Sequence, residues 1–206
     1  MALQIRGLRL GLISSLTVAV RMESVALVAF LASLMTLAGC SPSAKLPSFG
    51  VVDDFELTDQ SGKPFRSQSL AGRVWIADFI FTNCAGPCPR MTAEMRKVQG
   101  ELAAVKDARL VSFTVDPDRD VPAVLDEYAK RYHAEPERWI FLTGPKATLH
   151  HITREVFKLG DVTGALDHST RFALVDQKGR IRGFYSSGDA EQMTRLVADA
   201  KGLAAD

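Results

Sequence analysis

The sequence predicts an α/β fold in which helices cover both faces of a central mixed sheet, a three-layer sandwich. From about residue 50, strand-like apolar segments alternate with amphipathic helical segments. The run RVWIADFIFT (73–82) is almost continuously apolar and rich in β-branched and aromatic residues, which is typical of a central strand covered on both faces. Met91, Met95, Val98 and Leu102 then recur at helical spacing. These observations predict one domain.

The elements follow in chain order. A small hairpin is expected over residues 55–70, with its turn at 59–62, before the central strand at 73–82. The first helix should begin near Cys88, because Pro87 and Pro89 are tolerated only in a first helical turn. The segment RLVSFTVD (109–116) is a second buried strand, and Asp120 is placed to cap the next helix. The remaining elements are a strand at 139–144, a helix striped by Leu149, Ile152 and Val156, a hairpin turning at 177–179, and a last helix striped by Met193, Leu196, Val197 and Ala200.

The first 39 residues have the pattern of an export signal. Three arginines and one glutamate are their only charges, and an apolar stretch ends in small residues before Cys40. The tetrad LAGC (37–40) resembles the lipobox of bacterial lipoproteins, which implies lipidation of Cys40 and anchoring on a membrane. The alternative is a free cysteine in an uncleaved anchor helix, and translation from either Met1 or Met22 leaves the rest of the chain exported. We therefore expect a signal peptide at 1–39, a tether at 40–50 and a single domain at 51–206.

Charge narrows the class of partner. Without residues 1–39, 22 of the 25 basic residues and 23 of the 24 acidic residues remain, a net charge of −1. A balanced charge without basic clusters does not indicate a nucleic-acid partner.

Two cysteines of the predicted domain, Cys84 and Cys88, lie in FTNCAGPCP (81–89), between the central strand and the helix. This position suggests a thioredoxin-like sheet with both sulfurs near the positive end of a helix, where thiolates are favoured and pKa values fall. Such a pair can form a disulfide, exchange disulfides, or bind a soft cation such as Cu(I) or zinc. A stapling disulfide would close too short a loop to stabilise the fold much, so a chemical role is favoured.

A third ligand would distinguish a metal site from a plain dithiol. His133, His150 and His151 fall on predicted helices, where surface positions are the simpler interpretation. His168 lies at the mouth of a predicted strand, after an irregular stretch, where functional residues are common. From the residues alone, its role as a ligand stays open.

Three motifs in order, FTNCAGPCPRMT, VSFTVDPDRDVPAVLDEYA and DHSTRFALVD, resemble the Sco (SenC/PrrC) family of copper-assembly proteins over about residues 51–203. The resemblance implies a thioredoxin-like fold and copper, as Cu(I) or Cu(II), bound by Cys84, Cys88 and His168, with Asp116 supporting the site. Asp116 precedes a proline, so a turn role is an equal alternative. Met91 and Met95 lie on the apolar stripe and are interpreted as core.

The resemblance also implies a function and a place. The family's client is the Cu(A) centre of cytochrome c oxidase subunit II, and its members face the periplasm or cell exterior from the bacterial inner membrane. One hypothesis is therefore copper delivery to that centre. The alternatives are a thiol–disulfide oxidoreductase that uses Cys84 and Cys88 as a redox pair, a peroxiredoxin-like peroxidase supported by Thr82 and Arg171, and a copper or redox sensor.

Overall fold

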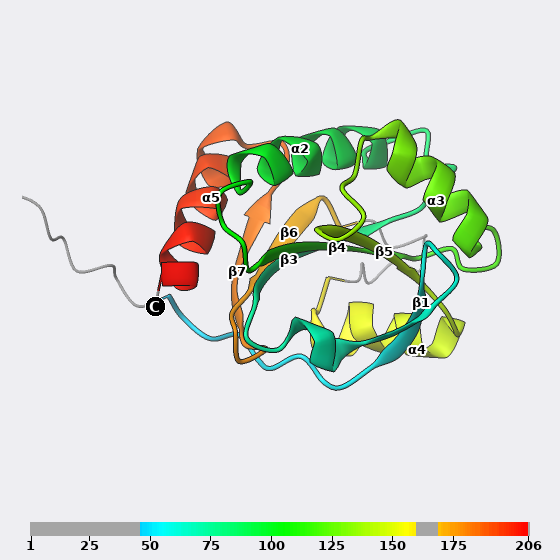
Figure 1. Ribbon diagram of the computed structural model, residues 1–206, viewed down its shortest axis with the longest axis horizontal. Helices are drawn as coiled ribbons and strands as arrows, with labels where there is room; N and C mark the ends of the chain where they lie inside the picture. The colour runs from blue at the N-terminus through cyan, green and yellow to red at the C-terminus, as the bar shows by residue number, and fades with distance from the viewer. Residues whose placement is uncertain (1–45, 160–168, 206) are drawn as a thin grey trace, which may run out of the picture. The chain divides into compact units, whose positions relative to one another are not determined.

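A mixed sheet forms the middle layer of the computed structural model, which describes residues 46–159 and 169–205 (Figure 1). The seven strands in these ranges lie in the order β2-β1-β5-β4-β3-β6-β7. Neighbouring strands β3, β4 and β5 are parallel, and the outer strands pair antiparallel. The bounds are β1 (Glu56–Asp59), β2 (Pro64–Arg66), β3 (Val74–Ile80), β4 (Ala108–Thr114), β5 (Trp139–Thr143), β6 (Arg171–Val175) and β7 (Ile181–Ser186).

Strand β3 is central because all seven of its residues are buried. Its side chains alternate between two apolar clusters: Ile76 and Ile80 face one, whereas Trp75 and Phe79 face the other. Such two-sided burial requires a layer of helices or loops on each face of the sheet.

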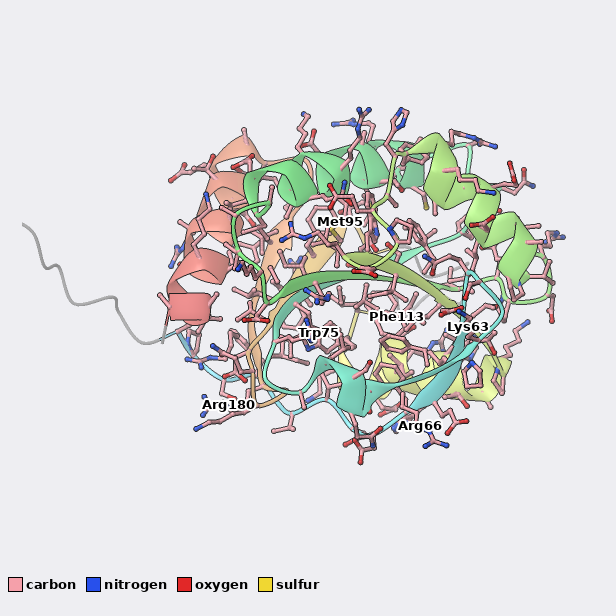
Figure 2. All side chains as sticks on the ribbon, in the orientation of Figure 1. Lys63, Arg66, Trp75, Met95, Phe113 and Arg180 are labelled. Atoms are coloured by element: carbon pink, nitrogen blue, oxygen red, sulfur yellow. The ribbon has the colours of Figure 1, made fainter. Side chains whose placement is uncertain are left out.

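Helices form the outer layers. On one face lie α2 (Cys88–Glu101), α3 (Pro122–Arg131) and α5 (Ala190–Ala205), and on the other lie the short η2 (Ser67–Leu70) and α4 (Lys146–His151), which continues as the π-helical turn η3 (Ile152–Val156). Figure 2 shows Met95 between α2 and the sheet, with Trp75 and Phe113 on the opposite side. The helix–sheet–helix sandwich predicted from the sequence is confirmed.

The local predictions agree with these elements, with two differences. The helix striped by Leu149, Ile152 and Val156 widens into η3 after its first six residues. The second difference is at α3, where Val121 is the N-cap residue and makes no side-chain capping bond, so the predicted capping role of Asp120 is wrong. The carboxylate of Asp120 binds elsewhere, as described below.

Residues 46–52 run beside the outer strand β7. The Phe49 N–H donates to the Ile181 carbonyl at 2.9 Å, and the Ile181 N–H donates to the Gly50 carbonyl at 2.9 Å. Arg182 donates to the carbonyls of Leu46 and Pro47. Pairing of this kind covers backbone groups that an edge strand would otherwise expose.

The predicted signal segment, Cys40 and most of the predicted tether lie outside the described residues. Within 46–159 and 169–205, the structure contains no helix of the length and apolar character needed to cross a membrane.

Candidate metal centre

Three chain segments meet at one end of the sheet. Strands β3 and β4 are parallel neighbours, with Ile80 opposite Thr114, so the segments that follow them leave the same edge. The Val115 N–H extends this pairing by donating to the Ile80 carbonyl at 2.8 Å. Strand β6 is antiparallel to β3 and begins at Arg171, so the chain enters it at this same end. The cysteines lie in the first of these segments.

Cys84 lies in the loop after β3, and Cys88 is the first residue of α2. Both are free thiols and both are buried, with 8% of Cys84 and none of Cys88 exposed. The Gly86 N–H donates to the Cys84 sulfur at 3.3 Å, and Cys84 lies close enough to Cys88 to raise the pKa of its thiol. The helix begins where Pro87 (φ −75°, ψ −26°) already has helical geometry. The structure therefore brings together two sulfurs that the sequence places near one another.

The electrostatics of Cys88 differ from the prediction. Burial raises the pKa of the Cys88 thiol to about 12, and its neighbours Cys84 and Asp78 push it in the same direction. A backbone hydrogen bond at Phe81 opposes the shift without reversing it. The predicted lowering by the helix terminus is therefore wrong for Cys88, because desolvation outweighs the helix dipole.

Beneath the pair lies a buried acid. Asp78 points from β3 to the same side as Ile76 and Ile80 and has no exposed surface. Neither of its carboxylate oxygens has a hydrogen-bond partner among the described residues. Burial raises the pKa of Asp78 to about 7. The Ser112 side chain on β4 acts against this shift but lies outside hydrogen-bond geometry.

A second buried polar group holds the start of α2. The Thr92 hydroxyl donates to the Cys88 carbonyl at 2.9 Å and lies 2.9 Å from the Tyr128 hydroxyl. Because a threonine hydroxyl has only one proton, Tyr128 is the donor in the second contact. Burial raises the pKa of Tyr128 well above its ordinary value, which keeps that proton in place. Helix α3 is thereby joined to the first turn of α2.

Asp120 joins the segments that follow β3 and β4. It is fully buried, and its carboxylate accepts hydrogen bonds from the Thr82 N–H (3.1 Å), the Thr82 hydroxyl (2.5 Å) and the Thr114 hydroxyl (2.6 Å). The Thr82 hydroxyl is thus directed to a carboxylate, whereas a peroxidase would direct it to the cysteine pocket.

Asp116 takes part in a turn. Its carbonyl accepts from the Asp120 and Arg119 N–H groups, and its carboxylate accepts from the Arg119 guanidinium at 2.8 Å. Its N–H donates to the Thr114 hydroxyl at 3.0 Å, which connects it to the Asp120 network. The proposed support of a metal by Asp116 stays a prediction.

His168 and Asp167 lie outside the described residues, in the segment 160–168, so the third predicted ligand stays a prediction. Within the described ranges, no group of three histidine, cysteine or acidic side chains is arranged to hold a metal. The exposed His151 is near a single acid, with its Nε2 atom 3.3 Å from Oδ2 of Asp53. Met91 and Met95 are buried in the core, as predicted. The described residues thus supply two soft ligands, and a third has to come from elsewhere.

Three residues near the site, Asp78, Thr92 and Tyr128, are not among those predicted from the sequence. Asp78 had a signal, since it is the only charged residue within the apolar run of β3. The local sequence contains no signal for the hydrogen bond between Thr82 and Asp120, because the two residues are 38 positions apart.

A dithiol at the start of a helix, directly after the central strand of a mixed sheet, defines a protein of the thioredoxin-like class. Within that class, the chain belongs to the SCO1/SenC family, whose model matches residues 44–204.

Three solved structures show the likeness. A SCO1/SenC family lipoprotein from Bacillus anthracis is 35% identical, with a TM-score of 0.71 over 78% of this chain and 99% of that one. BsSco, a Sco-family cytochrome c oxidase assembly protein in which a disulfide switch was identified, is 32% identical, with a TM-score of 0.69 over 78% of this chain and 97% of that one. Yeast Sco1 with copper bound is 25% identical, with a TM-score of 0.61 over 74% of this chain and 89% of that one. These neighbours confirm the predicted fold and family.

Proposed function

We propose that the chain is a membrane-anchored copper-binding protein that delivers copper to, or prepares the cysteines of, the Cu(A) site of cytochrome c oxidase subunit II. The observation that carries the proposal is the pair of adjacent free thiols, Cys84 and Cys88, at the end of the central strand. The copper-bound yeast relative and the oxidase-assembly relative support it.

The donor set suits copper. Two sulfurs and one imidazole make a soft, three-coordinate site, which Cu(I) prefers over harder ligands. In this proposal Cys84 and Cys88 provide the sulfurs and His168 provides the nitrogen. Cys84 keeps a small exposed area (8%) and Cys88 has none, so we expect a client to approach the pair from the Cys84 side.

The proposed location follows from the N-terminal sequence. Lipid on Cys40 would hold the domain on the inner membrane, facing the periplasm or cell exterior, and the Bacillus anthracis relative is a lipoprotein. A domain at the membrane surface could reach the exposed part of a membrane-bound oxidase through the tether.

The test is a titration of the fully reduced protein with Cu(I) and Cu(II), with stoichiometry and ligand spectra as readouts. We expect one copper per chain, and a large loss of affinity in His168→Ala. The matched control is His150→Ala, which removes an exposed imidazole from α4 on the opposite face of the sheet and should bind copper like the parent. Equal affinity of the parent and His168→Ala would refute the ligand assignment, and preference for zinc in competition would refute copper as the cargo.

A second candidate, thiol–disulfide exchange, is favoured by the proximity of two free thiols, Cys84 and Cys88, with Cys84 near enough to raise the pKa of Cys88. Cys84 is the more exposed and would attack a client disulfide as a thiolate, which releases one client thiolate and forms a mixed disulfide. Cys88 would then attack Cys84, which releases the second client thiolate. The client disulfide is reduced by two electrons, and the protein dithiol is oxidised to a disulfide. We expect Cys84→Ser to prevent attack and Cys88→Ser to accumulate the mixed disulfide, whereas turnover in either variant would contradict this reaction.

A further inference from the structure

We propose that Asp120 is a positioning residue that holds Cys84 against Cys88, and that it thereby sets how readily the pair forms a disulfide. This role rests on the proposed function only in that both involve the thiols of Cys84 and Cys88. The Asp120 carboxylate hydrogen bonds to Thr82 and Thr114 and to neither sulfur, so it acts on Cys84 through Thr82.

Among the described residues, the loop that carries Cys84 makes few hydrogen bonds, although the Cys84 side chain packs in the apolar cluster under α2. Between β3 and α2, Asn83, Ala85 and Gly86 are exposed. Two local bonds shape this stretch, from the Cys84 N–H to the Phe81 carbonyl and from the Gly86 N–H to the Cys84 sulfur, both at 3.3 Å. Bonds of this length within a short turn do not fix the turn relative to the sheet. Its position therefore depends on how its flanks are held.

Asp120 holds the flank that precedes Cys84. Both donors of Thr82, the N–H and the hydroxyl, are directed to its carboxylate, which also accepts from Thr114 at the end of β4. The Thr82 and Thr114 hydroxyl oxygens lie 2.5 and 2.6 Å from the carboxylate oxygens, at the short end of the range for hydrogen bonds between oxygens. Asp120 is fully buried, so water cannot replace these bonds without a local opening.

The other flank is held by the same segment of chain. Two residues beyond Asp120, the chain enters α3, and Tyr128 of that helix donates to Thr92 in the first turns of α2. Segment 120–128 thus contacts the chain on both sides of the cysteine pair. The contact between Asp120 and Thr82 lies next to Cys84, the cysteine outside regular structure. Loss of this contact should therefore change the distance between the sulfurs more than loss of the contact between Tyr128 and Thr92.

The measurable consequence is the effective concentration of one thiol at the other. In equilibrium with glutathione disulfide, the protein dithiol transfers two electrons and two protons, giving the protein disulfide and two molecules of reduced glutathione. A loop released from Asp120 samples positions in which the sulfurs are apart, which lowers the equilibrium constant for the disulfide. We expect a fall of about tenfold or more in Asp120→Ala, a shift of about 30 mV in the two-electron potential.

The experiment uses the full-length chain in detergent, with alkylation and mass measurement of the thiols at defined glutathione ratios. Thr82→Val removes only the hydroxyl donor and should give a smaller shift in the same direction, and Thr82→Ser should restore the parent value. Asp118→Asn removes an exposed carboxylate from the same loop and should leave the equilibrium unchanged. Ile181→Val, a buried change at the opposite end of the sheet, corrects for general loss of stability.

The outcomes separate the alternatives. Parent-like equilibrium constants in both Asp120→Ala and Thr82→Val would overturn the proposal, as would an equal shift in Ile181→Val. If Asp120→Ala does not fold, the comparison of Thr82→Val with Thr82→Ser decides by itself. Because the readout contains no copper, a failure of copper binding in the parent would count against the proposed function and leave this measurement intact.

Discussion

The buried carboxyl of Asp78 should make the stability of the protein fall as pH rises, and Asp78→Asn should remove that dependence. Burial raises the pKa of Asp78 from 3.8 to about 7, and no described group donates a hydrogen bond to it. Well below pH 3.8 the side chain is protonated in both folded and unfolded chains, so it contributes no pH dependence there. Between the two pKa values the unfolded chain releases a proton that the folded chain retains, and the free energy of unfolding declines until the folded pKa is passed.

The size of the effect follows from the shift. A difference of about three pKa units, at 1.36 kcal/mol per unit, corresponds to roughly 4 kcal/mol. This is a large part of the 5–15 kcal/mol by which domains of this size are typically stable. Asparagine has nearly the same shape and cannot ionise. The difference in unfolding free energy between Asp78→Asn and the parent should therefore shift in favour of the variant by up to about 4 kcal/mol from pH 4 to pH 8.

The assay is urea unfolding of the reduced, copper-free protein at a series of pH values. The fluorescence of Trp75 and Trp139, both buried, reports the transition. Asp118→Asn, at an exposed carboxyl, should run parallel to the parent and controls for the loss of an acid in general. Parallel curves for Asp78→Asn and the parent would refute the reasoning, because they would mean that Asp78 titrates alike in the folded and unfolded chains.

Three further predictions concern contacts around the sheet and are measured by urea unfolding at pH 7. Tyr128→Phe removes the donor to Thr92 and should cost about 0.5–1.5 kcal/mol, and an unchanged midpoint would show that the bond is not formed. Arg182→Met removes one of the two arginine partners of the buried Asp176 and should lower the free energy of unfolding by roughly 1–3 kcal/mol. A smaller loss of stability in Arg182→Met than in Arg180→Met would contradict this prediction. Gly183→Ala should cost about 1–3 kcal/mol, because a Cβ there would lie 2.7–2.9 Å from the ring and hydroxyl of Tyr185; parent stability would mean that the ring moves freely.

The elements of the fold could be predicted because each leaves a local pattern. The continuous apolar run of β3 and the helical stripe from Met91 indicate their structures without knowledge of distant residues. The predicted hairpin turn at residues 177–179 contains Gly179, which has the left-handed backbone (φ 72°) that such a turn requires. The start of α2 at Cys88 followed from the two prolines in the same way.

The surroundings of the thiols could not be predicted, because they depend on contacts between distant segments. The pairing of β3 with β4 brings Thr82 beside Asp120. The local sequence around Asp120 shows only an aspartate that precedes a helix. The expected helix cap was a reasonable use of that aspartate, but three donors from Thr82 and Thr114 satisfy it instead.

The pKa of Cys88 is raised instead of lowered because burial, which a sequence does not show, outweighs the helix terminus. A helix N-terminus favours a nearby anion by about 0.3–1 kcal/mol at an exposed position, which is less than one pKa unit. Complete burial costs a charged group several times as much, and burial is a property of the assembled layers. At Cys88 the sheet lies beneath the sulfur, and the neighbouring thiol and Asp78 add in the same direction. A cysteine at a helix start is therefore made more acidic only where solvent reaches it, and the Cys88 side chain has no exposed surface.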